Sequence, residues 1–290
     1  DRLGLTCAES ESLAAPLPRN SLRDLYWRMT RAGMGFGSRL SSGLKLGFDT
    51  GFDSGSTLDY VYRNTPTGTS AVGRLIDRNY LDSIGWRGIR QRKLHVEELL
   101  RLAMAQLRDQ GREVRIVDIA AGHGRYILEA LQGIDPLPES ILLRDYSDLN
   151  VRDGGALIRD KGLEAIARFV KGDAFDRADL AALDPKPTLA VVSGLYELFA
   201  DNQMVSGSLA GLADAVAPGG YLVYTGQPWH PQLELIARAL TSHREGQAWV
   251  MRRRTQAEMD QLVAAAGFRK IGMRVDQWGI FSVSLAQRVQ

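Results

Sequence analysis

An acidic residue followed by three small residues at alternate positions is the part of the sequence best suited to chemistry. Asp118 stands near the end of an apolar run, and Ala120, Gly122 and Gly124 follow it. Residues this small let the backbone approach a ligand closely before a helix starts. The pattern therefore predicts a loop that binds a nucleotide-type cofactor.

Two elements must hold this loop in place. The apolar residues of 114–119 suit a strand that is covered on both faces, and the apolar residues of 127–131 predict a short helix that ends near Gly133. The glycine spacing also bears on the nucleotide. A G-x-G-x-x-G fingerprint counted from Gly122 would need a third glycine where the chain has Ile127, so NAD fits poorly.

Strands and helices alternate through the rest of the chain. Apolar runs predict strands at 141–143, 167–170, 188–192 and 221–225. A helix before the last of these should stop at Ala-Pro-Gly-Gly, because proline blocks further helix and glycine permits a chain reversal. A helix from 255 to 266 and two strands between 268 and 285 complete the pattern. This alternation predicts an α/β fold.

The motif Asp-x-Ala-x-Gly-x-Gly and its flanking segments resemble the class I S-adenosylmethionine-dependent methyltransferases, from about residue 90 to the end of the chain. That family usually has glycine where this chain has Ala120. The helix, Pro-Gly-Gly and strand that end at 225 are typical of it. The resemblance implies a Rossmann-like, seven-stranded, mostly parallel sheet with helices on both faces, preceded by a helical and glycine-rich N-terminal region. It also implies S-adenosyl-L-methionine as the cofactor.

The resemblance assigns roles to polar residues that follow the strands. Asp145 is expected to accept hydrogen bonds from both ribose hydroxyls, although it could instead cap the following helix. Asp173 is expected beside the adenine amino group, with a purely conformational Gly-Asp turn as the alternative. Arg90 belongs to a basic cluster at 87–93 that could grip the methionine carboxylate of the cofactor or simply face solvent at a helix start. The other expected cofactor residues are Tyr146, Ala174 and Ser193.

Methyl transfer from a sulfonium is an in-line displacement, so positioning of the acceptor atom can supply most of the rate. A base would assist a hydroxyl, thiol or protonated amine by about 10² to 10⁴-fold. Tyr196, Glu197 and His230 are the candidates, because they follow strands whose ends face the expected site. Tyr196 and Glu197 could equally open a helix, and His230 could be a packed turn residue.

The expected activity is methyl transfer to a small-molecule or lipid-like acceptor. The chain has Ser-Gly-Leu-Tyr at 193–196 rather than an Asn-Pro-Pro-Tyr sequence, which weighs against methylation of a nucleic-acid base. A catalytically silent cofactor-binding subunit is one alternative. An enzyme that transfers another group from the same cofactor is a second.

The composition also bears on the partners, metal sites and location that can be expected. The 290 residues carry a net charge of +2, so no nucleic-acid partner is expected. A single cysteine, Cys7, excludes an internal disulfide, and four widely separated histidines give no metal-ligand spacing. No stretch approaches the roughly 20 apolar residues of a membrane-spanning helix. A cytoplasmic location is expected, with a peripheral membrane position as the alternative because 252–254 is an Arg run expected at the surface.

Residues 1–90 are expected to form an accessory region before a cofactor domain at 91–290. They divide into a tail, a helix near 21–31, a stretch with seven glycines from Gly33 to Gly55, and two more helices. The glycine-rich stretch is either a flexible cover over the site or a mobile linker. Segments 51–64 and 84–93 resemble the leader of a methyltransferase module that follows an α/β-hydrolase domain in some bacterial proteins. A hydrolase domain could then precede this chain in a longer polypeptide, although the chain itself has no G-x-S-x-G elbow.

Overall fold

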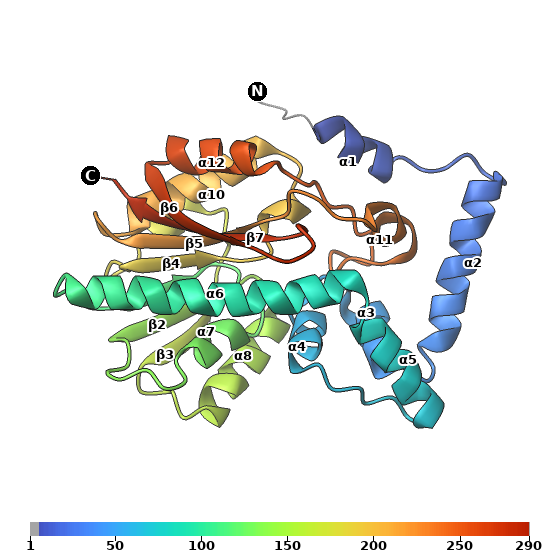
Figure 1. Ribbon diagram of the computed structural model, residues 1–290, viewed down its shortest axis with the longest axis horizontal. Coiled ribbons are helices and arrows are strands. Elements are labelled where there is room, and N and C mark those ends of the chain that lie inside the picture. The colour runs from blue at the N-terminus through green and yellow to red at the C-terminus, as the bar shows by residue number, and fades with distance from the viewer. Residues whose placement is uncertain (1–5, 290) are drawn as a thin grey trace.

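The computed structural model describes residues 6–289, and within them seven strands form one sheet in the order β3-β2-β1-β4-β5-β7-β6 (Figure 1). Neighbouring strands among β1 to β5 are parallel, whereas β7 pairs antiparallel with β5 and with β6. The predicted α/β, mostly parallel, Rossmann-like sheet is confirmed. The strands are β1 (Arg115–Asp118), β2 (Ser140–Asp145), β3 (Ala167–Lys171), β4 (Leu189–Val192), β5 (Tyr221–Gly226), β6 (Phe268–Val275) and β7 (Ser282–Arg288).

Helices cover both faces of the sheet. One face packs on α6, α7 and α8, and its core joins Leu99, Ile127 and Val191. The other packs on α9, α10 and α12, with Val192 and Leu209 in its core. Alternate residues of one strand thus enter opposite cores, as a sheet buried on both faces requires. These helices are α6 (Ile84–Asp109), α7 (Arg125–Ala130), α8 (Asp148–Asp160), α9 (Arg177–Ala181), α10 (Asn202–Ala215) and α12 (Gln256–Ala265).

Strand order brings three loops together. The carboxyl end of β1 lies between those of β2 and β4, because Asp118 pairs in register with Leu143 on one side and Val191 on the other. The connections leave β1 and β4 in opposite directions along the sheet, which opens a crevice beyond the carboxyl ends of the strands. The predicted cofactor loop begins at this point.

A second group of helices packs beside the sheet, at the right of Figure 1. Its core joins Phe52, Trp86 and Trp249 and includes the turn between β6 and β7 through Phe281. The group consists of α2 (Leu22–Gly37), α3 (Ser42–Thr50), α4 (Gly55–Arg63), α5 (Ala71–Leu81), the start of α6 and α11 (Leu233–Ala239), with α1 (Cys7–Ala14) against α11.

The glycine-rich stretch is helical over most of its length, so the expectation of a mobile linker is wrong. Ser41 and Ser54 accept hydrogen bonds from the first turns of α3 and α4 as N-caps. A Cβ at Gly43 would collide with the Tyr80 ring, and one at Gly47 with Phe52. These two glycines therefore permit close packing of helices and aromatic rings.

The Arg run at 252–254 corrects another expectation, since two of its members are buried. Arg252 donates from Nη1 to Asn202 Oδ1 at 2.9 Å and pairs with Glu258, and Arg254 donates to the carbonyl of Tyr196 at 2.6 Å. Burial lowers the pKa of Arg254 to about 10. The run ties the segment before α12 to the loop after β4, which explains why it is not a free basic surface.

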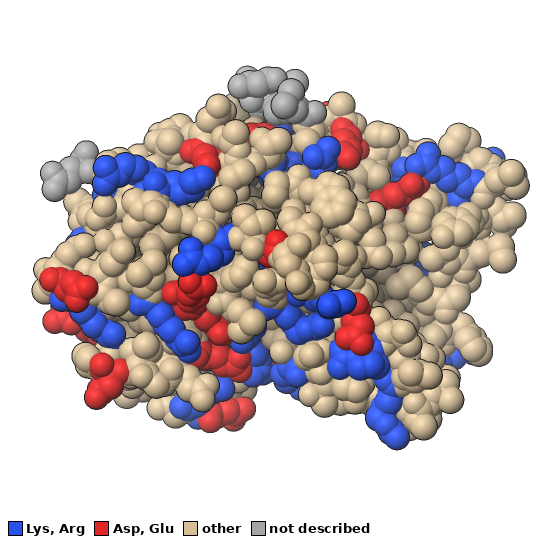
Figure 2. Space-filling model, in the orientation of Figure 1, with Lys and Arg blue, Asp and Glu red and all other residues tan. Residues whose placement is uncertain are grey.

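Charges of both signs are interspersed on the face shown in Figure 2, with a wide uncharged area beside them. Arg274 and Glu98, for example, lie 2.6 Å apart. Within residues 6–289, no helix combines the length and hydrophobicity that crossing a membrane requires.

Candidate active site

The loop after β1 depends on two glycines with left-handed backbone. Gly122 has φ +58° and Gly124 has φ +74°, a region that side chains disfavour. A Cβ at Gly124 would also collide with Leu143 of the neighbouring strand. The Ala121 N–H of the loop donates a hydrogen bond of 2.9 Å to the Arg144 carbonyl of that strand. In the structure, Gly122 and Gly124 are therefore needed for the left-handed backbone of the loop, and Gly124 also for its packing against Leu143.

Asp118, at the end of β1, stabilises this loop through hydrogen bonds. Its side chain is fully buried and accepts hydrogen bonds from the Ala120 N–H at 3.1 Å and from the Tyr126 hydroxyl at 2.6 Å. Burial raises the pKa of Asp118 to about 7, because desolvation disfavours the charged carboxylate more than these two bonds favour it.

Asp145 fastens the loop from the side. Its Oδ2 accepts from the Gly122 N–H and its Oδ1 from the Ser147 N–H, both at 3.0 Å. The N-cap residue of α8 is Ser147, so Asp145 does not cap that helix with its side chain. A carboxylate has about four acceptor sites, and two of those on Asp145 remain for hydroxyl groups.

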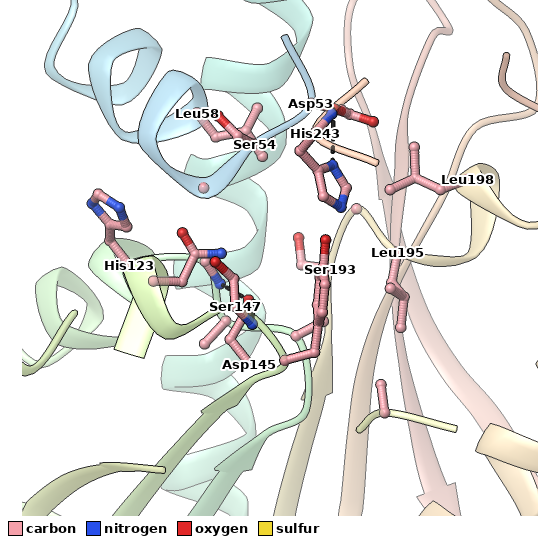
Figure 3. A pocket seen from close by; sticks show the side chains of 18 of the residues that line it. Asp53, Ser54, Leu58, His123, Asp145, Ser147, Ser193, Leu195, Leu198 and His243 are labelled. Atoms are coloured by element: carbon pink, nitrogen blue, oxygen red, sulfur yellow. Dashed lines mark hydrogen bonds and ion pairs between the residues drawn. The ribbon is translucent and has the colours of Figure 1, made fainter. Parts of the chain in front are cut away.

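A cavity of about 640 Å³ lies over the carboxyl ends of β1, β2 and β4. Figure 3 shows Asp145 and Ser147 on one side of it and Leu195 and Leu198 on the other. Eight of the ten expected cofactor residues line this cavity: Ala120, Gly122, Gly124, Asp145, Tyr146, Asp173, Ala174 and Ser193. Asp118 lies beneath the loop, and Arg90 lines neither this cavity nor the second one described below.

Helix α4 closes one side of the cavity. A Cβ at Gly122 would lie 3.3 Å from Gly55 Cα, so backbone packs nearly on backbone. Arg125 Nε, at the start of α7, donates to Asp59 Oδ1 at 2.6 Å, and His123 Nε2, within the loop, lies 3.3 Å from Ser56 Oγ. Helix α4 thus contacts the predicted cofactor loop and the start of α7 through a hydrogen bond and an ion pair.

A carboxylate and an imidazole meet at the top of the cavity. His243 Nδ1 lies 2.9 Å from Asp53 Oδ1, and Asp53 also accepts from the His243 N–H and the Ser242 hydroxyl, both at 2.6 Å. Figure 3 shows the His243 ring pointing from Asp53 into the space above Ser193. His243 Nδ1 lies within ion-pair distance of Asp53 but makes no hydrogen bond within residues 6–289. The tautomer that carries its proton on Nδ1 would leave Nε2 as an acceptor. His243 is therefore placed to contact a ligand in the cavity.

No sequence pattern indicates that Asp53 and His243, the Asp–His dyad, lie together. Asp53 stands in the glycine-rich stretch that was expected as a cover, but His243 lies 190 positions away, in a loop after α11. Only the packing of that loop on the start of α4 brings the two side chains together.

The three candidate bases occupy different places. Tyr196 lines neither cavity; its hydroxyl bonds to Ser208 Oγ at 2.9 Å, and burial raises its pKa. Glu197 pairs with the buried Arg92 at 3.2 Å. His230 accepts the Gln232 N–H on Nδ1 at 3.0 Å, and burial lowers its pKa to about 4. Its proton therefore sits on Nε2, which leaves no free lone pair for a base.

The basic cluster at 87–93 lies within α6 rather than before it. Arg90 Nη1 donates to the Leu81 carbonyl at 2.8 Å, which joins α6 to α5. Arg92 is the member that reaches the loop after β4, through Glu197. Neither guanidinium lines the 640 Å³ cavity; its lining arginines are Arg125 and Arg244.

A second cavity, of about 360 Å³, adjoins the first. The two share the lining residues Asp53, Leu58, Gly194 and Leu198. The second cavity extends from this boundary between α3, α5, the start of α6 and α11. Glu197 and His230 belong to its wall.

Comparison with known proteins places this geometry in a protein class. A family model described as "Putative methyltransferase" matches residues 1–288, and the chain belongs to that family. The "Uncharacterized protein YnbC" of Escherichia coli K12 is 58% identical over 273 residues, which are 94% of this chain. The chain spans 46% of the length of that relative.

Two solved structures share the fold at low sequence identity. A protein of Bordetella parapertussis described as a possible exported protein has a TM-score of 0.62 at 17% identity, over 80% of this chain and 79% of its own. The magnesium protoporphyrin IX methyltransferase ChlM of Synechocystis PCC 6803, solved with bound SAH, has a TM-score of 0.54 at 14% identity, over 82% and 97%.

Proposed function

We propose that the chain transfers a methyl group from S-adenosylmethionine to a small-molecule acceptor. The observation that carries the proposal is Asp145, a buried carboxylate bonded to the Gly122 loop at the edge of a 640 Å³ cavity, in a chain of a methyltransferase family. Cavities of this size are typical of cofactor sites.

S-adenosylmethionine is the cofactor that the family and the fold support. It supplies a methyl group on a positively charged sulfur. In this proposal Asp145 binds the ribose hydroxyls, Asp173 faces the adenine amino group, and the half-exposed Tyr146 ring flanks the base. The carboxylates of Asp49, Asp53, Asp59, Asp145 and Asp173 line the cavity, which favours a cationic ligand.

The remaining residues would position the acceptor. Residues 91–290 form the cofactor domain in this proposal, and residues 1–90 supply α3 and α4 as the cover of the site. The chain then holds the acceptor atom in line with the methyl carbon and the departing sulfur, which is the largest contribution a protein makes to such a displacement. A preceding hydrolase domain in a longer polypeptide is a further proposal, which rests on the resemblance of segments 51–64 and 84–93 described above.

Calorimetric titration with S-adenosylmethionine and S-adenosylhomocysteine tests the cofactor site, with NAD as the negative ligand. Asp145→Asn should weaken binding by about ten- to a hundredfold, the range expected for lost hydrogen bonds to a charged acceptor. The matched control is Asp148→Asn, since Asp148 is highly exposed and lines neither cavity. A thermal melt of each variant separates lost contacts from a disturbed loop.

The outcomes distinguish the proposal from its rivals. Equal affinity of Asp145→Asn and Asp148→Asn, or no binding by the parent chain, would overturn the cofactor assignment. Once an acceptor is turned over, S-adenosylhomocysteine as the product supports methyl transfer, whereas methylthioadenosine supports transfer of the aminopropyl group. Turnover of either kind excludes a catalytically silent subunit.

A further inference from the structure

The second cavity is placed to receive the molecule that is methylated, and this inference rests on the function proposed above. Its boundary with the cofactor cavity is formed by Asp53, Leu58, Gly194 and Leu198. Gly194 lies just beyond β4, after Ser193, at the edge where the reacting groups of an open α/β sheet meet. A molecule in the second cavity would therefore meet the cofactor at this boundary.

The wall of the second cavity is mainly apolar and partly aromatic. Trp86 and Trp249 are stacked with their ring centres 6.1 Å apart and an angle of 21° between the rings. Other side chains in the wall include Leu44, Ile76 and Phe281. Flat apolar surfaces of this kind bind rings through offset stacking and burial of apolar area.

The charged groups in this wall are already balanced. Arg92 and Glu197 pair at 3.2 Å with both side chains buried, and the Arg92 guanidinium also lies 4.8 Å from the centre of the Phe281 ring. The Asp53 carboxylate accepts hydrogen bonds from the Ser242 hydroxyl and the His243 N–H, and His230 is neutral because burial lowers its pKa to about 4. A ligand with a fixed negative charge would find no positive charge free to match it, and desolvation would oppose its entry.

Four buried polar groups on residues of the wall lack a hydrogen-bond partner within residues 6–289: Gln227 Nε2, Trp249 Nε1, Arg92 Nε and the Tyr80 hydroxyl. Gln227 and Trp249 carry the uncharged N–H donors, on residues that are 2% and 7% exposed. Buried donors are satisfied in most proteins, so unpaired donors in a cavity wall indicate a ligand that brings acceptor atoms. An uncharged oxygen on an apolar ring meets this requirement.

We infer that the 360 Å³ cavity binds an uncharged aromatic molecule with a phenol-type hydroxyl, and that this hydroxyl is the methyl acceptor. Wall donors such as Gln227 and Trp249 recognise oxygen atoms of the ligand. The ring lies against Trp86, Trp249 and Phe281, and the reacting hydroxyl lies at the boundary beside Asp53 and His243.

The dyad determines which hydroxyl can react. The acceptor oxygen forms a bond to the methyl carbon, the carbon–sulfur bond breaks with its electron pair on sulfur, and the hydroxyl proton moves to His243 Nε2. The products are a methyl ether, S-adenosylhomocysteine and a protonated imidazole. A phenol, with a pKa near 10, yields its proton to imidazole far more readily than an aliphatic alcohol does.

Calorimetry with 2-naphthol, in the presence of S-adenosylhomocysteine, tests the cavity. We expect 2-naphthol to bind, and 2-naphthoate, which has the same rings and a fixed negative charge, to bind at least about tenfold more weakly. Ile76→Trp should abolish 2-naphthol binding by filling the cavity, because Ile76 lines it. Leu75→Trp is the matched control, since Leu75 is the preceding residue of α5, is 63% exposed and lines neither cavity.

A second pair of variants tests recognition of the oxygen without filling the cavity. Gln227→Leu should weaken the binding of 2-naphthol by about tenfold. Gln132→Leu should not, because Gln132 is exposed and distant from both cavities. Equal binding of 2-naphthol and 2-naphthoate, or unchanged 2-naphthol binding in both Ile76→Trp and Gln227→Leu, would overturn the inference.

Two further readouts separate this inference from the proposed function. Each protein is first titrated with S-adenosylhomocysteine alone. Failure of that titration in the parent chain rejects the cofactor site, whereas normal cofactor binding without 2-naphthol binding rejects only the acceptor class. With S-adenosylmethionine, 2-methoxynaphthalene is the expected product, and bound 2-naphthol that yields none would overturn the hydroxyl assignment.

Discussion

Substitution of Asp118 by asparagine should change how the stability of the protein depends on pH. In the parent chain the pKa of Asp118 rises from 3.8 to about 7 on folding, because the carboxyl group is fully buried. The folded protein therefore keeps a proton that the unfolded chain releases between about pH 4 and pH 7. The unfolded state binds fewer protons in that window, so stability falls as the pH rises through it.

The magnitude follows from the shift. One pKa unit corresponds to about 1.4 kcal/mol, so the whole shift corresponds to about 4 kcal/mol. Of this, about 3 kcal/mol is lost between pH 5 and pH 8, because the unfolded carboxyl group is already ionised at pH 5. Asparagine cannot ionise, yet it can accept from the Ala120 N–H and donate to the Tyr126 oxygen, the two partners of Asp118.

Urea unfolding at pH 5 and pH 8, followed by tryptophan fluorescence, measures the effect. The free energy of unfolding of Asp118→Asn, relative to the parent chain, should rise by about 3 kcal/mol between the two pH values. The exposed Asp148→Asn variant should follow the parent chain. A gap between Asp118→Asn and the parent that stays constant within about 0.5 kcal/mol would refute the buried, protonated carboxyl group.

Two further predictions concern the dyad and the buried ion pair. His243→Ala should lower the rate of 2-naphthol methylation by about 10² to 10⁴-fold in single-turnover assays, with a much smaller change in the affinity for S-adenosylhomocysteine; an unchanged rate would exclude His243 as the base. Glu197→Gln should lower the free energy of unfolding by about 3–5 kcal/mol because it leaves the Arg92 charge buried without its carboxylate, and the double variant with Arg92→Met should recover much of that loss in chemical unfolding. Equal stability of single and double variants would contradict this account.

The sheet and its loop could be predicted because their signals are local. Even an apolar run as short as 189–192 predicts a buried strand. Gly122 and Gly124 both have the left-handed backbone that glycine favours. The carboxyl ends of parallel strands meet at one edge, so the strand order together with the family resemblance allowed Asp145 and Ser193 to be assigned to one site, and both line the same cavity.

The rest of the site depends on contacts between distant segments, which sequence patterns do not encode. Arg252 and Arg254 look like surface residues until Asn202 and Glu258 are placed against them. The glycines of α3 resemble those of a linker, yet they mark close packing against aromatic rings whose positions are fixed by other helices. Tyr196 follows β4 as an active-site residue would, but its side chain turns into the core.

The contact of Gly55 with Gly122 has a consequence for how such a chain can change through evolution. The cavity wall is shared by two stretches of sequence, one near residue 55 and one near residue 122. A side chain at Gly122 would press on Gly55, and a side chain at Gly55 would collide with Asn150 of α8, so neither position can accept a larger residue unless a distant neighbour moves. Substitutions at the two places are therefore expected to be epistatic. A new acceptor preference would arise by paired exchanges across this contact, and a chimera that joins the first helices of one relative to the sheet of another would inherit a mismatched wall.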